Sequence, residues 1–134
     1  MNQNFFSDKY PQGVPASVDV EKYKNVVEVF NKSVKKFADR PAFTALGQTL
    51  NYGDIDRLSA DFAAYLQNDT NLQKGDRIAV QLPNLLQYPI VVFGAMRAGL
   101  IVVNTNPLYT EREMEHQFND SGAKALVVLA QMAG

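Results

Sequence analysis

Apolar residues recur at helical spacing in two stretches of the first half of the chain. Residues 25–38 carry them three or four positions apart, which is typical of an amphipathic helix. A second helix is predicted to begin after Asn51, because Asp54 three residues later stands in capping-box position. The apolar positions are Val26, Phe30, Val34 and Phe37 in the first helix and Ile55, Leu58, Phe62 and Leu66 in the second.

Two short runs separate these helices. Pro41 is expected to end the first helix, and residues 42–46 and 49–52 then flank Gly47-Gln48. Short apolar runs on either side of a glycine-containing turn predict a β-hairpin. Residues 1–24 contain Pro11, Gly13 and Pro15 among scattered aromatic residues, and we expect them to form an irregular arm laid over a surface.

The second half of the chain alternates strand and helix patterns. Strands are predicted at residues 77–82, 100–103 and 124–130, and the last two are apolar runs typical of strands buried on both faces. The helix between the first two strands is predicted to begin at Pro83-Asn84 and to carry Leu85, Leu86, Val92 and Met96 toward Gly99. The next helix opens with Thr110-Glu111-Arg112-Glu113, turns Met114 and Phe118 inward and closes at Gly122.

Alternating strands and helices predict the α/β class, with a partial parallel sheet and crossover helices preceded by a helix and a β-hairpin. The sheet is incomplete, because no helix follows residues 124–130 to cover the second face of the last strand. Parallel sheets are normally buried on both faces. We therefore interpret residues 25–134 as an unfinished α/β unit, and we favour the front part of a larger protein over a sheet covered by something else.

Composition excludes several classes of protein. The chain has 134 residues, of which 46% are hydrophobic and 20% charged, which is ordinary for one globular domain. Its net charge of −1 gives no reason to expect a nucleic-acid partner. It has no cysteine and one histidine, so thiolate metal sites and disulfide scaffolds are excluded. The N-terminus lacks the pattern of a signal peptide, and the expected location is the cytoplasm.

The glycines of Gly94-Ala95-Met96-Arg97-Ala98-Gly99 have the spacing of a phosphate-binding loop. That loop requires Lys and Ser or Thr next, and Leu100 and Ile101 stand there instead. We interpret them as small residues at a packed helix end. The basic cluster at the end of the first helix is likewise interpreted as a solvated helix end rather than a phosphate site; its members are Lys32, Lys35, Lys36 and Arg40.

His116 is the only histidine. Together with Glu113 it forms one Glu-x-x-His motif, whereas a di-iron bundle needs two such motifs and further carboxylates. Asp120 lies one helical turn from His116, and the pair could act as a general base. Such a base needs a nucleophile to activate, and no serine in the sequence has the flanking glycines of a nucleophile turn. A surface histidine is the favoured interpretation.

The polar turn Asn104-Thr105-Asn106-Pro107-Leu108-Tyr109 has two interpretations. It follows a predicted strand at its carboxyl end, where open α/β sheets bind ligands. Asn and Pro are also common turn formers, so the same residues can stitch the turn to the next helix. Both interpretations stay open, with the second favoured.

Several segments together resemble the acyl-adenylate-forming enzymes. Leu50-Asn51-Tyr52-Gly53-Asp54-Ile55 resembles the first core motif of that family, with Asn51, Asp54 and Ile55 as conservative departures. The second core motif is similar to the segment from Met96 to Pro107. Three segments are similar in sequence to bacterial long-chain fatty acid–CoA ligases in particular: Gln81-Leu82-Pro83-Asn84, residues 104–110, and residues 113–123. The segment from Lys74 to Val80 matches the turn and strand between the two motifs.

The resemblance implies the N-terminal part of the large domain of a fatty acid–CoA ligase. Such an enzyme uses ATP and Mg²⁺ to turn a long-chain fatty acid into an acyl-adenylate, and coenzyme A then displaces AMP. It also implies that the phosphate loop and catalytic residues lie beyond Gly134. We therefore expect no catalytic, cofactor-binding or metal-binding residue in this segment, no tight binding of a cofactor to it, and no activity of the segment alone.

The resemblance further implies a cytoplasmic protein peripheral at the inner face of the membrane, with the remainder of its own chain as a partner and a homodimer left open. Two alternatives remain. One is a self-contained, non-catalytic α/β binding or assembly module. The other keeps the superfamily and replaces the substrate by an aryl or short-chain acid.

Overall fold

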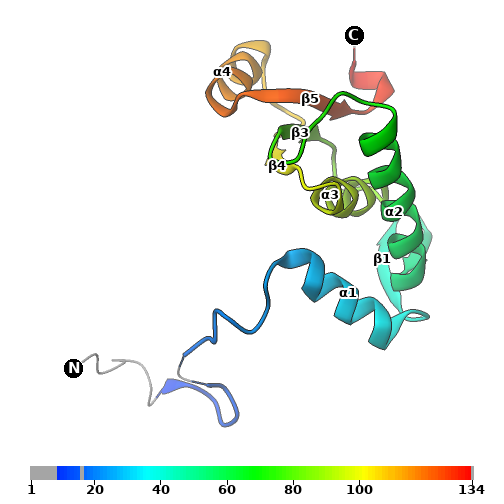
Figure 1. Ribbon diagram of the computed structural model, residues 1–134, viewed down its shortest axis with the longest axis vertical. Coiled ribbons are helices and arrows are strands. Elements are labelled where there is room, and N and C mark those ends of the chain that lie inside the picture. Colours follow the sequence, from blue (N-terminus) through cyan, green and yellow to red (C-terminus); the bar gives the residue numbers. More distant parts are fainter. Residues whose placement is uncertain (1–8, 16, 134) are drawn as a thin grey trace.

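The computed structural model describes residues 9–15 and 17–133. The described part of the N-terminal arm contains no α-helix or strand, its residues are exposed, and it leads away from α1 (Figure 1). The elements in chain order are α1 (Val26–Phe37), β1 (Pro41–Ala45), β2 (Gln48–Asn51), α2 (Tyr52–Asn68), β3 (Arg77–Gln81), α3 (Gln87–Arg97), β4 (Ile101–Asn104), α4 (Glu111–Ser121), β5 (Ala123–Val128) and a 3₁₀ turn at Ala130–Met132. The predicted α/β class is confirmed.

The second half forms a three-stranded parallel sheet in the order β4-β3-β5. The central strand is buried on both faces, with Ile78, Ala79 and Val80 each 1% exposed. Ile78 packs with Leu66 of α2 and Ala95 of α3. Since neighbouring strand residues point to opposite faces, Ala79 and Gln81 face the other side, where α4 lies (Figure 1).

The expectation that β4 and β5 are buried on both faces is wrong. Each pairs only with β3 within the described residues, so both are edge strands. Ile101 of β4 is 48% exposed and Leu126 of β5 is 43% exposed. An apolar run does not reveal the order of strands in a sheet. Here β3, the first of the three parallel strands along the chain, lies between β4 and β5.

The predicted helix start at Pro83-Asn84 is also wrong. Residues 84–86 form a turn, with Leu85 N donating to the Pro83 carbonyl oxygen at 2.7 Å, and α3 begins only at Gln87. Residues Pro89, Val91, Gly94 and Ala95 are the buried members of α3, whereas Leu85, Leu86, Val92 and Met96 are half-buried.

Helix boundaries predicted from caps are confirmed. Asn51 Oδ1 accepts from Asp54 N at 2.7 Å while Asp54 Oδ2 accepts from Asn51 N at 3.1 Å, and Thr110 and Glu113 form the same box before α4. Gly122 ends α4 in the left-handed region at φ 63°. The hairpin is confirmed too, although its turn is Leu46-Gly47 rather than Gly47-Gln48, since both residues adopt positive φ.

Candidate functional site

The carboxyl ends of the three parallel strands lie side by side. Val80 pairs with Asn104, and Gln81 pairs with Val128. The polar turn of residues 104–109 therefore leaves the sheet at the edge where open α/β folds bind their ligands. This edge is the candidate functional site, and its polar groups are held by residues from α3, α4 and β3.

Asn104 is held from two sides. The Tyr88 hydroxyl of α3 donates to Asn104 Oδ1 at 2.8 Å, and Gln117 Nε2 of α4 donates to the Asn104 carbonyl oxygen at 3.0 Å. Both oxygens of Asn104 thus accept hydrogen bonds from the fold. Gln117 Oε1 is buried and has no hydrogen-bond partner among the described residues.

Gln81 and Thr105 fix the following part of the turn. Gln81 is 5% exposed, and its Nε2 lies 3.1 Å from Met114 Sδ and 3.4 Å from the Asn106 carbonyl oxygen. Thr105 is 4% exposed, and its backbone N donates to the Val80 carbonyl oxygen at 3.0 Å. Asn106 Oδ1 accepts from Leu108 N at 3.0 Å, which makes an Asx turn.

These contacts support the interpretation that the turn is stitched to the next helix. Ligand contact by the same residues stays a prediction. Sequence reasoning did not assign Gln81, Tyr88 and Gln117 to the site; the only available signal was a polar residue, Gln81, near the end of an apolar strand.

The glycines that resembled a phosphate loop serve packing. A Cβ on Gly94 would lie 2.8 Å from Phe62 Cδ1 and 2.9 Å from the Ser59 carbonyl oxygen, so the glycine permits close contact between α3 and α2. Gly99 has φ +83° beyond the end of α3 and lies against Lys74. This is the interpretation favoured from the sequence.

His116 lies exposed on α4 beside a shallow depression lined only by residues of that helix. Within residues 9–15 and 17–133, no group of three or more His, Asp and Glu side chains is arranged to hold a metal ion. Three of the four basic residues near the end of α1 contact neighbouring side chains: Lys32 pairs with Glu28 at 2.7 Å, and Lys36 and Arg40 lie over the Phe37 ring.

Hydrogen bonds shift the pKa of three carboxyl groups. Lys32 lowers the pKa of Glu28, and Glu28 in turn raises the pKa of Lys32. Lys124, helped by the backbone N–H of Gln73, lowers the pKa of Asp76. The Thr110 backbone N–H, followed by its hydroxyl, lowers the pKa of Glu113. All three carboxylates cap or brace local structure.

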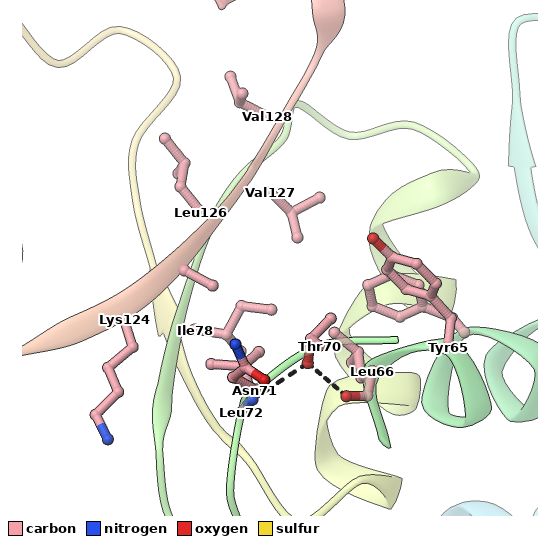
Figure 2. Close-up of a pocket in the computed structure, with 12 residues that line it drawn as sticks. Tyr65, Leu66, Thr70, Asn71, Leu72, Ile78, Lys124, Leu126, Val127 and Val128 are labelled. Atoms are coloured by element: carbon pink, nitrogen blue, oxygen red, sulfur yellow. Dashed lines mark hydrogen bonds between the residues drawn. The ribbon is translucent and has the colours of Figure 1, made fainter. Parts of the chain in front are cut away.

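A groove of about 590 Å³ runs between α2 and β5 (Figure 2). Its walls are mainly apolar, and sequence patterns did not predict it because distant segments build it. Its lining includes Tyr65, Leu66, Thr70, Leu126, Val127 and Val128. Among the described helices, none is both long and apolar enough to cross a bilayer.

The fold defines the class of protein. The chain superposes on the N-terminal subdomain of NpsA from Klebsiella oxytoca with a TM-score of 0.75 and 26% identity, covering 78% of this chain and 27% of that one. It superposes on VinN, solved with 3-methylaspartate, with a TM-score of 0.76 and 27% identity over 81% of this chain and 30% of VinN. The architecture is that of the N-terminal subdomain of adenylate-forming enzymes.

Residues 30–133 match the family of AMP-binding enzymes, and the chain belongs to this family. It is 49% identical over 126 residues to a long-chain-fatty-acid–CoA ligase of Escherichia coli O6:H1, covering 94% of this chain and 22% of the ligase. A ligase of the same name from Haemophilus influenzae is 49% identical over 98% of this chain and 23% of its own length. The chain thus spans about a fifth of these relatives, and the predicted family is confirmed.

Proposed function

We propose that the chain is the N-terminal part of a long-chain fatty acid–CoA ligase, and that residues 1–134 alone do not catalyse the reaction. The longer parent chain would join a long-chain fatty acid to coenzyme A with the use of ATP and Mg²⁺. The parent would work in the cytoplasm, peripheral to the inner face of the membrane, with the remainder of the chain packed on this segment.

Sequence identity supports a long-chain fatty acid as the proposed substrate. Identity is 49% over 94–98% of the chain to the long-chain ligases of Escherichia coli and Haemophilus influenzae, and 39% over 90% of the chain to a ligase of the same name from Bacillus subtilis. It falls to 33% over 78% of the chain for surfactin synthase subunit 2 of Bacillus subtilis, and to 26% for the NpsA subdomain. The relatives with the higher identities are named as ligases for long-chain fatty acids, whereas surfactin synthase subunit 2 is named for a different activity.

We propose that Mg²⁺ and ATP bind outside the described residues. The described residues hold no cluster of metal-binding side chains, the glycines at 94 and 99 pack against α2 and Lys74, and Lys32 and Lys124 are paired with Glu28 and Asp76. The role proposed for this segment is structural: it builds the first strands of the sheet and the turn at its carboxyl edge.

Pyrophosphate release by the parent protein tests the proposal. The full reading frame is assayed with ATP, Mg²⁺ and coenzyme A, and with a long-chain, a short-chain or an aryl acid. We expect release that depends on the long-chain acid, and none above background from residues 1–134. Aryl acids are included because NpsA has been solved with 3-hydroxybenzoyl-AMSN. Faster release with the aryl or short-chain acid would contradict the substrate class, and release by residues 1–134 would contradict their inactivity.

A further inference from the structure

Positive charge is concentrated in the N-terminal third of the chain. Residues 1–43 hold seven Lys and Arg against five Asp and Glu, whereas residues 44–134 hold six against nine, so the two parts have net charges of +2 and −3. The positive charge is densest around the end of α1, where four exposed basic residues accompany one acidic residue, Asp39. A basic, amphipathic helix of this kind is typical of proteins that bind membrane surfaces.

Exposed apolar side chains are concentrated in the same third. Of the thirteen large hydrophobic residues that are exposed in the described part of the chain, eight lie within residues 10–43. In the arm Val18 is 84% exposed and Val20 is 78% exposed, and on α1 Val26 is 55% exposed. Exposed apolar residues gathered in one region mark an interaction surface, whereas single scattered ones do not.

The arm and α1 lie at one end of the molecule and the parallel sheet lies at the other (Figure 1). The arm and α1 together are called the N-terminal surface below; it consists of residues 9–15 and 17–37. This surface is therefore separate from the carboxyl edge of the sheet and from the groove between α2 and β5.

We propose that the N-terminal surface binds an anionic phospholipid membrane. The exposed valines of the arm enter the headgroup layer, and Lys35 and Lys36 contact the lipid phosphates. This inference rests on the proposed function for the location of the parent protein at a membrane. It adds which surface of the chain makes the contact, and which sign of charge the lipids carry.

A membrane fits this surface better than a protein partner does. The described part of the arm contains no α-helix or strand, so its apolar side chains are spread along the chain and form no fixed shape. A protein partner must match such a shape, whereas a headgroup layer accepts apolar side chains in any arrangement. Lysine stems lie along apolar surface while their charged ends stay at the phosphates. A second copy would bring the same positive surface against itself in a symmetric contact, which is unfavourable.

Sedimentation of the parent protein with lipid vesicles tests the proposal. The vesicles contain phosphatidylcholine alone, or phosphatidylcholine and phosphatidylglycerol in equal parts, and no fatty acid is added. We expect the anionic vesicles to bind the protein at least about tenfold more tightly at low salt, and added salt to reduce this difference. Equal binding to the two kinds of vesicle would overturn the proposal. Binding to neither, with self-association of the protein in its place, would overturn it in favour of a second copy.

Charge variants with a matched control locate the surface. Lys35→Gln combined with Lys36→Gln removes two positive charges from α1, and we expect it to weaken binding to the anionic vesicles at least about tenfold. Lys74→Gln combined with Arg77→Gln removes the same charge at two exposed positions outside the surface, and the expected change is below about twofold. Equal weakening by the two double variants would overturn the assignment of the surface.

Apolar variants test the arm in the same way. Val18→Ser combined with Val20→Ser should weaken binding at least about fivefold, because the two valines leave the headgroup layer. Leu46→Ser combined with Leu108→Ser is the control, since these leucines are 90% and 87% exposed and lie outside the N-terminal surface. Unchanged binding of the valine variant would overturn the role of the arm. Pyrophosphate release without vesicles is measured separately: its absence would refute the ligase function, while vesicle binding still reports on this surface.

Discussion

Arg97 at the end of α3 holds Asp56 of α2 by two hydrogen bonds. Its Nη1 donates to the Asp56 carbonyl oxygen at 2.7 Å, and its Nη2 donates to the Asp56 carboxylate. The same Nη2 lies 3.0 Å from Asn31 Oδ1 of α1, and the guanidinium lies 5.2 Å from the centre of the Phe30 ring. One side chain, 16% exposed, therefore joins three helices that the sequence separates by up to 66 positions.

Replacing Arg97 is expected to loosen this junction. Arg97→Ala should lower the free energy of unfolding by about 1–2 kcal/mol, since charged hydrogen bonds contribute about 1.5–3 kcal/mol and the 42% exposure of the Asp56 side chain weakens the ion pair. Arg97→Lys should recover only part of the loss. Lysine keeps the positive charge, but its single ammonium cannot make both contacts with Asp56. Urea unfolding measures each change.

Arg57→Ala is the control for Arg97. Arg57 is 63% exposed and its ion pairs with Asp54 and Asp61 both measure 3.9 Å, so the expected change is below about 0.5 kcal/mol. Equal losses of unfolding free energy for Arg57→Ala and Arg97→Ala would show that the buried contacts of Arg97 stabilise the chain no more than an exposed ion pair does.

Gly94→Ala should destabilise the chain although alanine favours helices by about 1 kcal/mol over glycine. The new methyl would lie 2.8 Å from Phe62 Cδ1 and 2.9 Å from the Ser59 carbonyl oxygen, so α2 and α3 must move apart. The expected net loss is about 1–3 kcal/mol. In a Phe62→Leu background the loss should shrink but persist, since the Ser59 carbonyl remains. A more stable Gly94→Ala protein in thermal unfolding would disprove the tight contact.

The elements that sequence predicts best are those bounded by local chemistry. Asn51 with Asp54, Thr110 with Glu113, and Gly122 each fix a helix end through contacts within four residues, and all three are found as predicted. The start of α3 was missed because Pro83-Asn84 suits a turn as well as a helix start, and only the surrounding fold selects between them.

Strand order and the site could not be predicted in the same way. Whether Ile101 and Leu126 are buried depends on what packs on the faces of β4 and β5, and that information lies outside their own segments. The contacts that hold the polar turn join residues 16 and 33 positions apart, Tyr88 with Asn104 and Gln81 with Met114. Periodicity carries no signal for such pairs.

Acid should weaken the anchor between Asp76 and Lys124. The pKa of Asp76 is lowered below its ordinary value of 3.8, chiefly by Lys124, which lies 2.7 Å away. A carboxylate with a lowered folded-state pKa contributes stability above its unfolded pKa, and this contribution disappears as the pH falls through the folded value. The stability difference between wild type and Asp76→Asn should therefore be largest near neutral pH and vanish below the folded pKa. Chemical unfolding from neutral pH down to the acid limit measures it.

Lys124→Met separates the ion pair from the backbone contact. In that background Asp76→Asn should cost less, because only the hydrogen bond from Gln73 N still favours the carboxylate. A pH-independent difference between wild type and Asp76→Asn would contradict the assignment.

The contact between Tyr88 and Asn104 is expected to support the turn rather than to bind a ligand. Tyr88→Phe removes the hydroxyl that donates to Asn104 Oδ1 at 2.8 Å and should cost about 0.5–1.5 kcal/mol of stability. Asn104→Ala should cost a similar amount of stability. The double variant should cost less than the sum of the two single variants, because both single variants remove the same hydrogen bond. Tyr109→Phe removes a neighbouring hydroxyl without touching that bond and is the control. If the parent protein is the proposed ligase, Tyr88→Phe should change its KM for ATP and for the fatty acid by less than about twofold, because the oxygens of Asn104 already accept hydrogen bonds from the fold. A larger rise in KM with unchanged stability would instead place this turn in contact with substrate.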